Sequence, residues 1–444
     1  MRDREFQNDG VAVPAGRWTR MSRLGLMAST VAAGMVAEGA RHLAKGQVPS
    51  LSGMLLTPSN VKRVTNELAK LRGAAMKVGQ LMSMDAGDLI PPALSDMMSR
   101  LRSEAVCMPM SQLVSVLDKA WGYGWSNLFS RFNFTPAAAA SIGQVHQAIT
   151  RQGQALAIKV QYPGVRESID SDVDNVVSLL RLSGLLPATI EITRILDEAK
   201  KQLHAEADYQ REQEWMRLYA DHLGDNTAFL LPKPHAQLTT PCVLAMSWVE
   251  GSPIESLVSA PQDLRDHVVT LLFDLALKEI FQFRVLQSDP NFANYRFNQN
   301  QQKIVLLDFG ATRALSETMV EGYGKLIQGA LASSRDQMYE AATQIGYFSR
   351  EMTVQQTSAV MDLFEMACEP LCYRGLYDFA ASNLPRRMHD IGMTLAMDRD
   401  YWHSPPIDAL FLHRKLAGTY LLAARLKARV NIRALAERYI TTRV

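Results

Sequence analysis

Three polar side chains in the second half of the chain have the types and spacing that ATP chemistry needs. Asp289 and Asn294 are five positions apart in SDPNFAN, and Asp308 opens the tripeptide DFG. Phosphoryl transfer from ATP requires a carboxylate and a second oxygen ligand for Mg²⁺, a carboxylate that orients the nucleophile, and a lysine on the α- and β-phosphates. We assign the metal to Asp308 and Asn294, the nucleophile to Asp289, and the phosphates to Lys159 in ALAIKVQ.

The order of these motifs is more informative than any one of them. A lone DFG or AIK is common by chance and is usually structural. A strand lysine, a helix glutamate, D-x4-N, a hairpin and DFG in succession form the pattern that kinases use for ATP. Because Asp289, Asn294 and Asp308 are all present, the sequence favours catalysis over an inactive relative.

The lysine is predicted to lie on a strand. Ser141 to Tyr162 has the pattern of two strands joined by a turn at Arg151-Gln-Gly153. In the second strand the apolar residues share one face, so Lys159 lies on the other face beside Ala157. CVLAMSWVEGSPIE, from Cys242, is predicted to be a buried strand that ends in a turn.

One long helix is predicted over Glu191 to Leu218. Its apolar stripe begins with Ile192, Leu196, Ala199 and Leu203. The same spacing leads to Glu206 and Gln210, so we expect Glu206 to be buried and to need a cationic or hydrogen-bonding partner. Asp208 and Glu212 are four positions apart and are expected to share another face.

Further helices are expected before the strands. Val61 to Met82 keeps an apolar stripe at helical spacing, and residues 111–130 are also predicted to be helical. Lys77 and Gln80 lie opposite that stripe, where a solvated lysine is the usual outcome. A hairpin with the turn NQNQQ is predicted within Val285 to Leu315.

Composition limits the class of protein. The 444 residues are 47% hydrophobic and 21% charged, enough for two lobes. The 47 basic and 45 acidic side chains nearly balance, which argues against a nucleic-acid partner. The sequence has no run of 18 apolar residues. For the uncharged segment Leu24 to Ala37, packing on another helix and lying on a bilayer surface stay open as alternatives.

Four motifs give the chain a resemblance to a known family. They are Lys77-Val-Gly-Gln80, the alanine run before Ser141, Glu206-Ala-Asp208, and SDPNFAN with DFG. The chain resembles the atypical kinases that include UbiB and the AarF-domain (ADCK) proteins of coenzyme Q biosynthesis. The resemblance implies an α+β, protein-kinase-like two-lobed fold with an N-terminal helical extension. The implied domains are an N-terminal segment (1–45), the extension with the KxGQ motif (46–130), an N-lobe (131–250) and a C-lobe (251–444).

The resemblance also implies roles for the charged residues. Lys159 is expected to contact the phosphates and to pair with Glu212. Glu206 and Asp208 are expected to lie against the Lys77–Gln80 motif, which folds over the cleft where a protein substrate would dock.

The contacts with the nucleotide follow in the same way. Met246 falls at the gatekeeper position, and the Ser247 carbonyl and the Val249 amide are expected to bond to adenine. Glycine-rich loops cover phosphates because bare amides approach them closely. Alanines would stiffen such a loop. The residues expected to form it are Ala137, Ala138, Ala139, Ala140 and Ser141.

The sequence thus predicts an Mg²⁺-dependent enzyme that binds ATP or ADP. It is expected to hydrolyse ATP or to transfer phosphate to a small or lipid-like acceptor in ubiquinone biosynthesis. Two alternatives stay open, a protein Ser/Thr kinase and an ATP-gated regulatory or chaperone-like factor for a biosynthetic complex. Quinone-pathway proteins are the expected partners. Four scattered cysteines favour a reducing compartment, so we expect a cytoplasmic protein. Because the C-terminal transmembrane helices expected of the UbiB branch are lacking, we do not expect stable integral anchoring, and peripheral contact with the inner membrane stays open.

Overall fold

The computed structural model describes residues 68, 71–85, 107–182, 193–224, 228–348, 352–397 and 405–440. The chain divides into two compact units. The first consists of Met1–Ser83, Ile90–Glu214 and Lys233–Trp248, and the second of Met84–Leu89, Trp215–Pro232 and Val249–Val444. The segment predicted over residues 1–45 lies outside the described residues.

The first unit is built on an antiparallel sheet. Its strands are β1 (Phe129–Phe132), β2 (Ala138–Ala139), β3 (Gly143–Thr150), β4 (Ala155–Gln161) and β6 (Val243–Ser247). They follow the order β1-β3-β4-β6, and β2 pairs with β3. The predicted β3, β4 and β6 are confirmed, together with the turn that joins β3 to β4.

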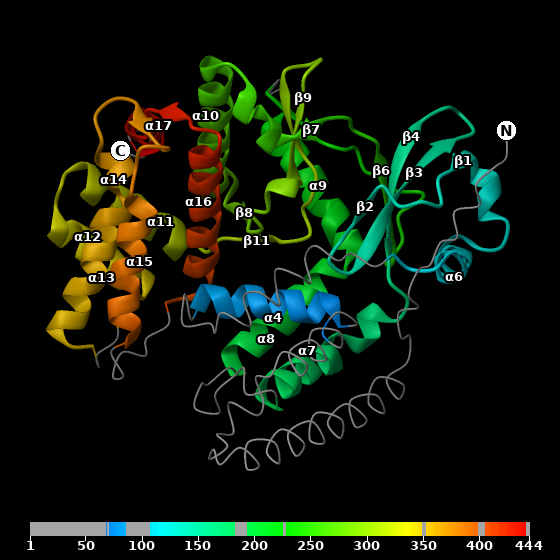
Figure 1. Ribbon diagram of the computed structural model, residues 1–444, viewed down its shortest axis with the longest axis horizontal. Coiled ribbons are helices and arrows are strands. Elements are labelled where there is room, and N and C mark those ends of the chain that lie inside the picture. The colour runs from blue at the N-terminus through cyan, green and yellow to red at the C-terminus, as the bar shows by residue number, and fades with distance from the viewer. Residues whose placement is uncertain are drawn as a thin grey trace, which may run out of the picture. The chain divides into compact units, whose positions relative to one another are not determined.

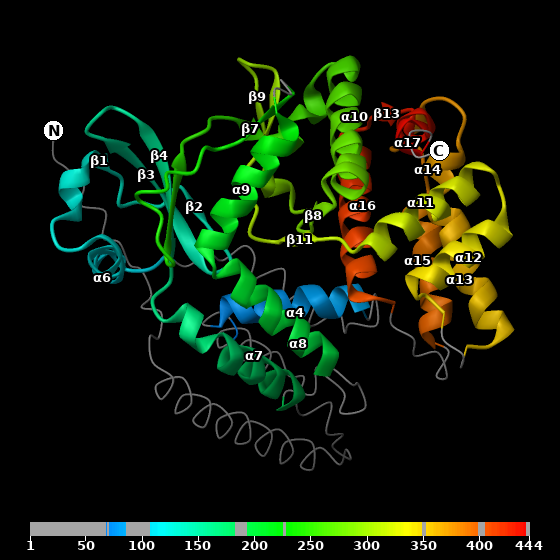
Figure 2. The same ribbon diagram turned by 180° about the vertical axis from the view of Figure 1, so that it is seen from behind.

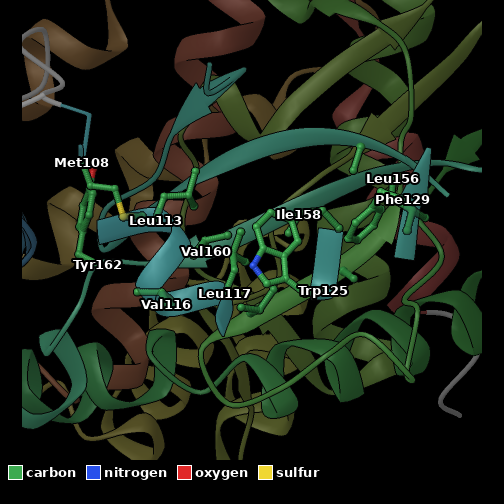
Figure 3. Packing of buried hydrophobic residues seen from close by; sticks show 13 residues of the cluster. Met108, Leu113, Val116, Leu117, Trp125, Phe129, Leu156, Ile158, Val160 and Tyr162 are labelled. Carbon is green, nitrogen blue, oxygen red and sulfur yellow. The ribbon is translucent and has the colours of Figure 1, made fainter. Parts of the chain in front are cut away.

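One face of this sheet packs on an apolar cluster. The cluster joins the apolar face of β4 to α6 (Met110–Trp121) and to the short helix η2 (Trp125–Leu128). Figure 3 shows Trp125 among these side chains. The prediction of helix over 111–130 is wrong beyond Trp121, because Gly122 and Gly124 adopt φ values of 82° and 87°. Strand β1 begins soon after them, at Phe129.

Four helices complete the first unit, and the last residues of two of them, α4 and α9, belong to the second. They are α4 (Arg72–Asp85), α7 (Val165–Leu182), α8 (Thr193–Glu206) and α9 (Tyr209–Leu223). Helix α4 lies alongside α8 in both views (Figure 1, Figure 2). The described part of the predicted stripe on α4 is buried, from Leu68 through Met82.

The single helix predicted over Glu191–Leu218 is wrong. The chain breaks at Ala207-Asp208 between α8 and α9. The Asp208 carboxylate accepts a hydrogen bond from the backbone N–H of Arg211 at 3.1 Å, which caps the new helix. The apolar register therefore ends at the break, and Gln210 is exposed. Because Asp208 is the cap, it does not share a helix face with Glu212.

The second unit contains three small strand systems. The first is a sheet of β5 (Phe229–Leu230), β10 (Lys303–Leu306), β9 (Tyr295–Asn298) and β7 (Ser252–Pro253), in that order. The predicted hairpin is β9 with β10. Outside this hairpin, β8 (Val285–Gln287) pairs with β11 (Thr312–Ala314). This pairing brings the start of SDPNFAN next to the residues that follow DFG. Strands β12 (Tyr377–Asp378) and β13 (Arg429–Val430) form a separate pair.

The rest of the second unit is helical. Its helices are α10 (Gln262–Lys278), η3 (Ile254–Ser259), η4 (Glu279–Phe283), η5 (Phe292–Asn294), α11 (Glu317–Leu331), α12 (Arg335–Ile345), α13 (Val354–Ala367), α14 (Glu369–Cys372), α15 (Leu384–Met397), α16 (Ile407–Arg425) and α17 (Ile432–Ile440). Helix α16 packs beside α10 (Figure 1, Figure 2). It ends at Arg425, shortly before β13. Within the described ranges, no helix combines the length and the apolar character needed to cross a bilayer.

Candidate active site

Lys159 and Glu212 form a buried ion pair in the first unit. The Lys159 ammonium donates to both carboxylate oxygens of Glu212 at 2.9 Å. It also lies 5.2 Å from the centre of the Tyr209 ring. The alternation of β4 explains the geometry, because the neighbours of Lys159 in the strand point into the apolar cluster while the lysine points away. The predicted pairing of Lys159 with Glu212 is confirmed.

A second ion pair joins α4 to the end of α8. Lys77 pairs with Glu206, and both side chains are largely buried. The hydroxyl of Ser141 donates to the other Glu206 oxygen at 3.1 Å. The solvated alternative for Lys77 is therefore wrong, and the partner that Glu206 was expected to need is Lys77. Gln80, one turn further along α4, is half-buried.

The alanine run forms one arm of a tight hairpin with β3. Ala138 and Ala139 pair with Val145 and Gln144, and the Ala140 N–H donates to the carbonyl of Gly143 at 2.9 Å. The first three alanines of the run are exposed. The backbone of the run is thus held in a strand by its pairing with β3.

Helix α4 touches the turn of this hairpin at Gly73. A Cβ on Gly73 would lie 2.9 Å from the side chain of Ile142 and 3.2 Å from the carbonyl of Ser141. Only a glycine allows this approach without displacing the turn. The helix with Lys77 and the loop with Ser141 are therefore packed against each other.

Gln161 is a site residue that the sequence analysis missed. Its Nε2 donates to the carbonyl of Ala207 at 2.7 Å, at the break between α8 and α9. One strand thus holds two parts of the site, since Lys159 binds α9 and Gln161 fixes the residue between Glu206 and Asp208. Gln161 lies two residues after Lys159 in the strand, so the sequence alone places both side chains on the same face of the sheet.

The residues assigned to adenine lie at the end of β6. Met246 is buried and pairs with Ala157 across the sheet. Ser247 is the last residue of β6, and its N–H donates to the carbonyl of Lys233 at 2.8 Å. Val249 is the first residue of the second unit after this strand.

In the second unit, Asp289 is held at both carboxylate oxygens. Nδ2 of Asn294 donates to its Oδ2 at 3.0 Å. Nη2 of Arg414, from α16, donates to its Oδ1 at 2.8 Å. The D-x4-N motif is therefore one hydrogen-bonded unit. Arg414 was not predicted as a site residue.

Asp308 is tied to the same region through the backbone. The N–H of Leu307 donates to the carbonyl of Asn294 at 3.1 Å, and Oδ1 of Asp308 accepts from the N–H of Gly310 at 2.9 Å. Phe309 between them is buried. These bonds bring the predicted metal ligands, Asn294 and Asp308, to neighbouring ends of β9 and β10.

The ligand atoms present suit magnesium. In the described parts of the chain, His, Cys, Asp and Glu side chains form no group of three or more that could hold a metal ion. Mg²⁺ is usually bound by one or two carboxylates together with substrate phosphates and water. Because Asn294 turns its Nδ2 toward Asp289, its Oδ1 can ligate a cation beside Asp308. Asn294 and Asp308 thus fit an Mg²⁺ ion that arrives with a nucleotide.

A buried charge network is centred on Lys415 of α16, next to the arginine that binds Asp289. Lys415 binds Glu279 at 3.0 Å and the Tyr295 hydroxyl at 3.1 Å, and Tyr219 donates to Glu279 at 2.9 Å. Burial alone would lower the pKa of Lys415, but Glu279 and Tyr295 raise it, so the lysine is charged. Its position on α16 directly follows Arg414.

Comparison with known proteins identifies the family. The ABC1 atypical kinase-like domain matches residues 100–342. The mitochondrial atypical kinase COQ8 of Saccharomyces cerevisiae is 36% identical over 425 residues, which cover 95% of this chain and 84% of the yeast protein. The mitochondrial atypical kinase COQ8B of Rattus norvegicus is 34% identical, with 95% and 80% covered. The solved complex of Rv3197 with erythromycin, from Mycobacterium tuberculosis, aligns with a TM-score of 0.58 at 25% identity, covering 84% of this chain and 93% of that one.

These matches agree with the structure of both units. The family match covers more than half of the chain and the relatives cover nearly all of it. Within the first unit the strand lysine pairs with its helix glutamate, and within the second unit the SDPNFAN and DFG segments are hydrogen-bonded to each other. The chain belongs to the ABC1 family of atypical kinases.

Proposed function

We propose that this kinase binds Mg·ATP and either hydrolyses it or transfers its γ-phosphoryl group to a small or lipid-like acceptor in ubiquinone biosynthesis. The observation that carries the proposal is the buried pair in which Lys159 meets Glu212 twice at 2.9 Å. A lysine is costly to bury, and a phosphate-binding role gives a reason to hold its ammonium in one place.

Each unit contributes its own groups to the reaction. From the first unit, Lys159 contacts the α- and β-phosphates. The alanine run and Ser141 cover the nucleotide, Met246 is the gatekeeper and the Ser247 carbonyl bonds to adenine. The Val249 amide, the other proposed adenine contact, belongs to the second unit. From the second unit, Asp308 and Asn294 hold Mg²⁺, which when bound neutralises charge on the β- and γ-phosphates. Asp289 orients the attacking hydroxyl or water.

Ser141 has a competing partner in this scheme. Its hydroxyl donates to Glu206, which also binds Lys77. A phosphate that takes this hydroxyl removes one hydrogen bond from Glu206. Nucleotide binding is therefore linked to the KxGQ motif through Glu206, and Asp208 caps the helix that follows. This link favours a catalyst whose nucleotide loop and helical extension act together.

Two other functions have some support. One relative, from Dictyostelium discoideum, is named a probable serine/threonine-protein kinase and is 31% identical over 452 residues. A regulatory, ATP-gated factor is the other candidate. Against it, Asp289, Asn294 and Asp308 are all retained and bonded in one region.

The pathway is tested by deleting the gene and measuring quinone. We expect ubiquinone to fall and to recover with the wild-type gene. Recovery with Asp289→Asn would favour the regulatory factor, because turnover would then be dispensable. Efficient transfer of labelled phosphate to generic proteins would favour a protein kinase. Normal quinone levels in the deletion strain would contradict the pathway.

Quinone-pathway proteins are the proposed partners. The proposed location is the cytoplasm, with peripheral contact to the inner membrane.

A further inference from the structure

The carboxylate of Asp289 is clamped from two sides by different elements. Asn294 of its own loop binds Oδ2 at 3.0 Å, and Arg414 of α16 binds Oδ1 at 2.8 Å. The Arg414 and Asp289 side chains are 18% and 24% exposed, so the pair is largely shielded. With both oxygens held, the carboxylate plane cannot rotate about its χ2 bond without breaking a charge-assisted hydrogen bond.

Helix α16 is a rigid support for this contact. Lys415, the next residue, is buried and binds Glu279 at 3.0 Å and the Tyr295 hydroxyl at 3.1 Å. Removing one partner from a buried ion pair is strongly destabilising, so this anchor fixes α16 in the core. The position of the Arg414 guanidinium is thereby fixed as well.

The same helix approaches the Asp289 loop with its backbone. A Cβ on Gly418 would lie 2.2 Å from Cβ of Pro290, the residue after Asp289. Arg414 and Gly418 are four positions apart, which places them on one helix face. The α16 face is thus shaped for close contact with the loop, and Arg414 reaches the carboxylate from it.

Helix α16 also contacts the segment after DFG. Asp408 binds Arg313 of β11 at 2.8 Å, and the Arg313 guanidinium lies 4.1 Å from the centre of the Phe411 ring. One helix therefore touches both the loop with Asp289 and the strand that follows Asp308. This arrangement suits a helix that holds the two catalytic segments in fixed positions.

We propose that Arg414 is a positioning residue, which orients the Asp289 carboxylate for the nucleophile without touching the nucleotide. The inference rests on the proposed role of Asp289. A fixed carboxylate presents its remaining lone pairs to the acceptor hydroxyl in one direction, and a displacement of about 1 Å can cost roughly 100-fold in rate. A merely structural ion pair would instead affect stability and leave turnover alone.

The test compares ATP turnover and nucleotide affinity in matched variants. We expect Arg414→Ala to lower kcat by about 10- to 100-fold, with the dissociation constant for ATP unchanged. Methylguanidinium in the buffer should restore part of the rate. Arg425→Ala is the control, because Arg425 lies on the same helix and binds Glu255 at 3.2 Å with 61% of its side chain exposed. We expect it to behave as wild type.

A double variant separates positioning from structure. If Arg414 acts through Asp289, the variant with both Asp289→Asn and Arg414→Ala should turn over ATP at the same rate as Asp289→Asn alone. If the rate losses of the two single variants multiplied in the double variant, the inference would be contradicted. A normal kcat in Arg414→Ala would contradict it as well. An unchanged rate in Asp289→Asn would instead contradict the proposed function, and the two failures are thus distinguishable.

Discussion

The charge of Glu212 should stabilise the first unit by an amount that can be measured. Glu212 is 1% exposed and Lys159 is 8% exposed, and two hydrogen bonds of 2.9 Å join them. Glu212→Gln keeps the size of the side chain but replaces the anion that accepts both hydrogen bonds from the ammonium with a neutral amide. Loss of one partner of a buried pair costs about 3–5 kcal/mol, so we expect the free energy of unfolding to fall by about that amount.

Replacing both partners separates stability from function. In the double variant with Lys159→Met and Glu212→Leu, apolar side chains fill the same space, and such exchanges are neutral or stabilise by about 1–4 kcal/mol. We expect wild-type stability or better, and no ATP turnover. Urea unfolding followed by circular dichroism measures the first quantity, and phosphate release measures the second.

An exposed pair in the same unit serves as the control. Lys200 and Asp174 lie 2.7 Å apart with side chains 26% and 57% exposed, so Lys200→Ala should cost no more than about 1 kcal/mol. If Glu212→Gln were as stable as the wild type, the buried charge pair would be refuted. If the double variant hydrolysed ATP, Lys159 would not be the phosphate-binding lysine.

Three more predictions concern the nucleotide loop and α16. Ala139→Gly loosens the strand that holds the loop by about 0.5–1 kcal/mol, and calorimetric titration should show a changed ATP or ADP affinity; identical isotherms would contradict this. Gly73→Val forces atoms against Ile142 and Ser141, an overpacking worth about 1–3 kcal/mol, and should weaken nucleotide binding in the same titration. Burial lowers the pKa of His413 to about 4, so the unfolded chain takes up the proton first as the pH falls. The free energy of unfolding should therefore decline from pH 6.5 to 4, and less steeply in His413→Phe.

The parts of the site that follow from local patterns could be predicted from the sequence. The alternation of β4 put Lys159 opposite the apolar face. Its pairing with Glu212 was implied by the family resemblance, and the structure joins this strand to α9 through that pair. The D-x4-N contact between Asp289 and Asn294 is likewise local.

The parts that depend on distant contacts could not be predicted. The spacing of the apolar residues carried the predicted helix across Ala207, whereas the break there is held by Gln161, 46 positions earlier. Arg414 reaches Asp289 across 125 positions, and nothing in its helical spacing marks it. The end of α6 is instead a local signal, because Gly122 and Gly124 adopt positive φ values that an α-helix does not allow.

The metal-dependent binding of ATP by Asp308→Asn is the measurement that tests the account most directly. Asp336→Asn is the matched control, because Asp336 is an exposed carboxylate in the first turn of α12, in the same unit. We predict that wild type and Asp336→Asn bind ATP more tightly as Mg²⁺ is added and release phosphate. Asp308→Asn should lose both responses while keeping its fold by circular dichroism. Unchanged Mg²⁺ dependence and turnover in Asp308→Asn would contradict the assignment of this site as the catalytic centre of the kinase.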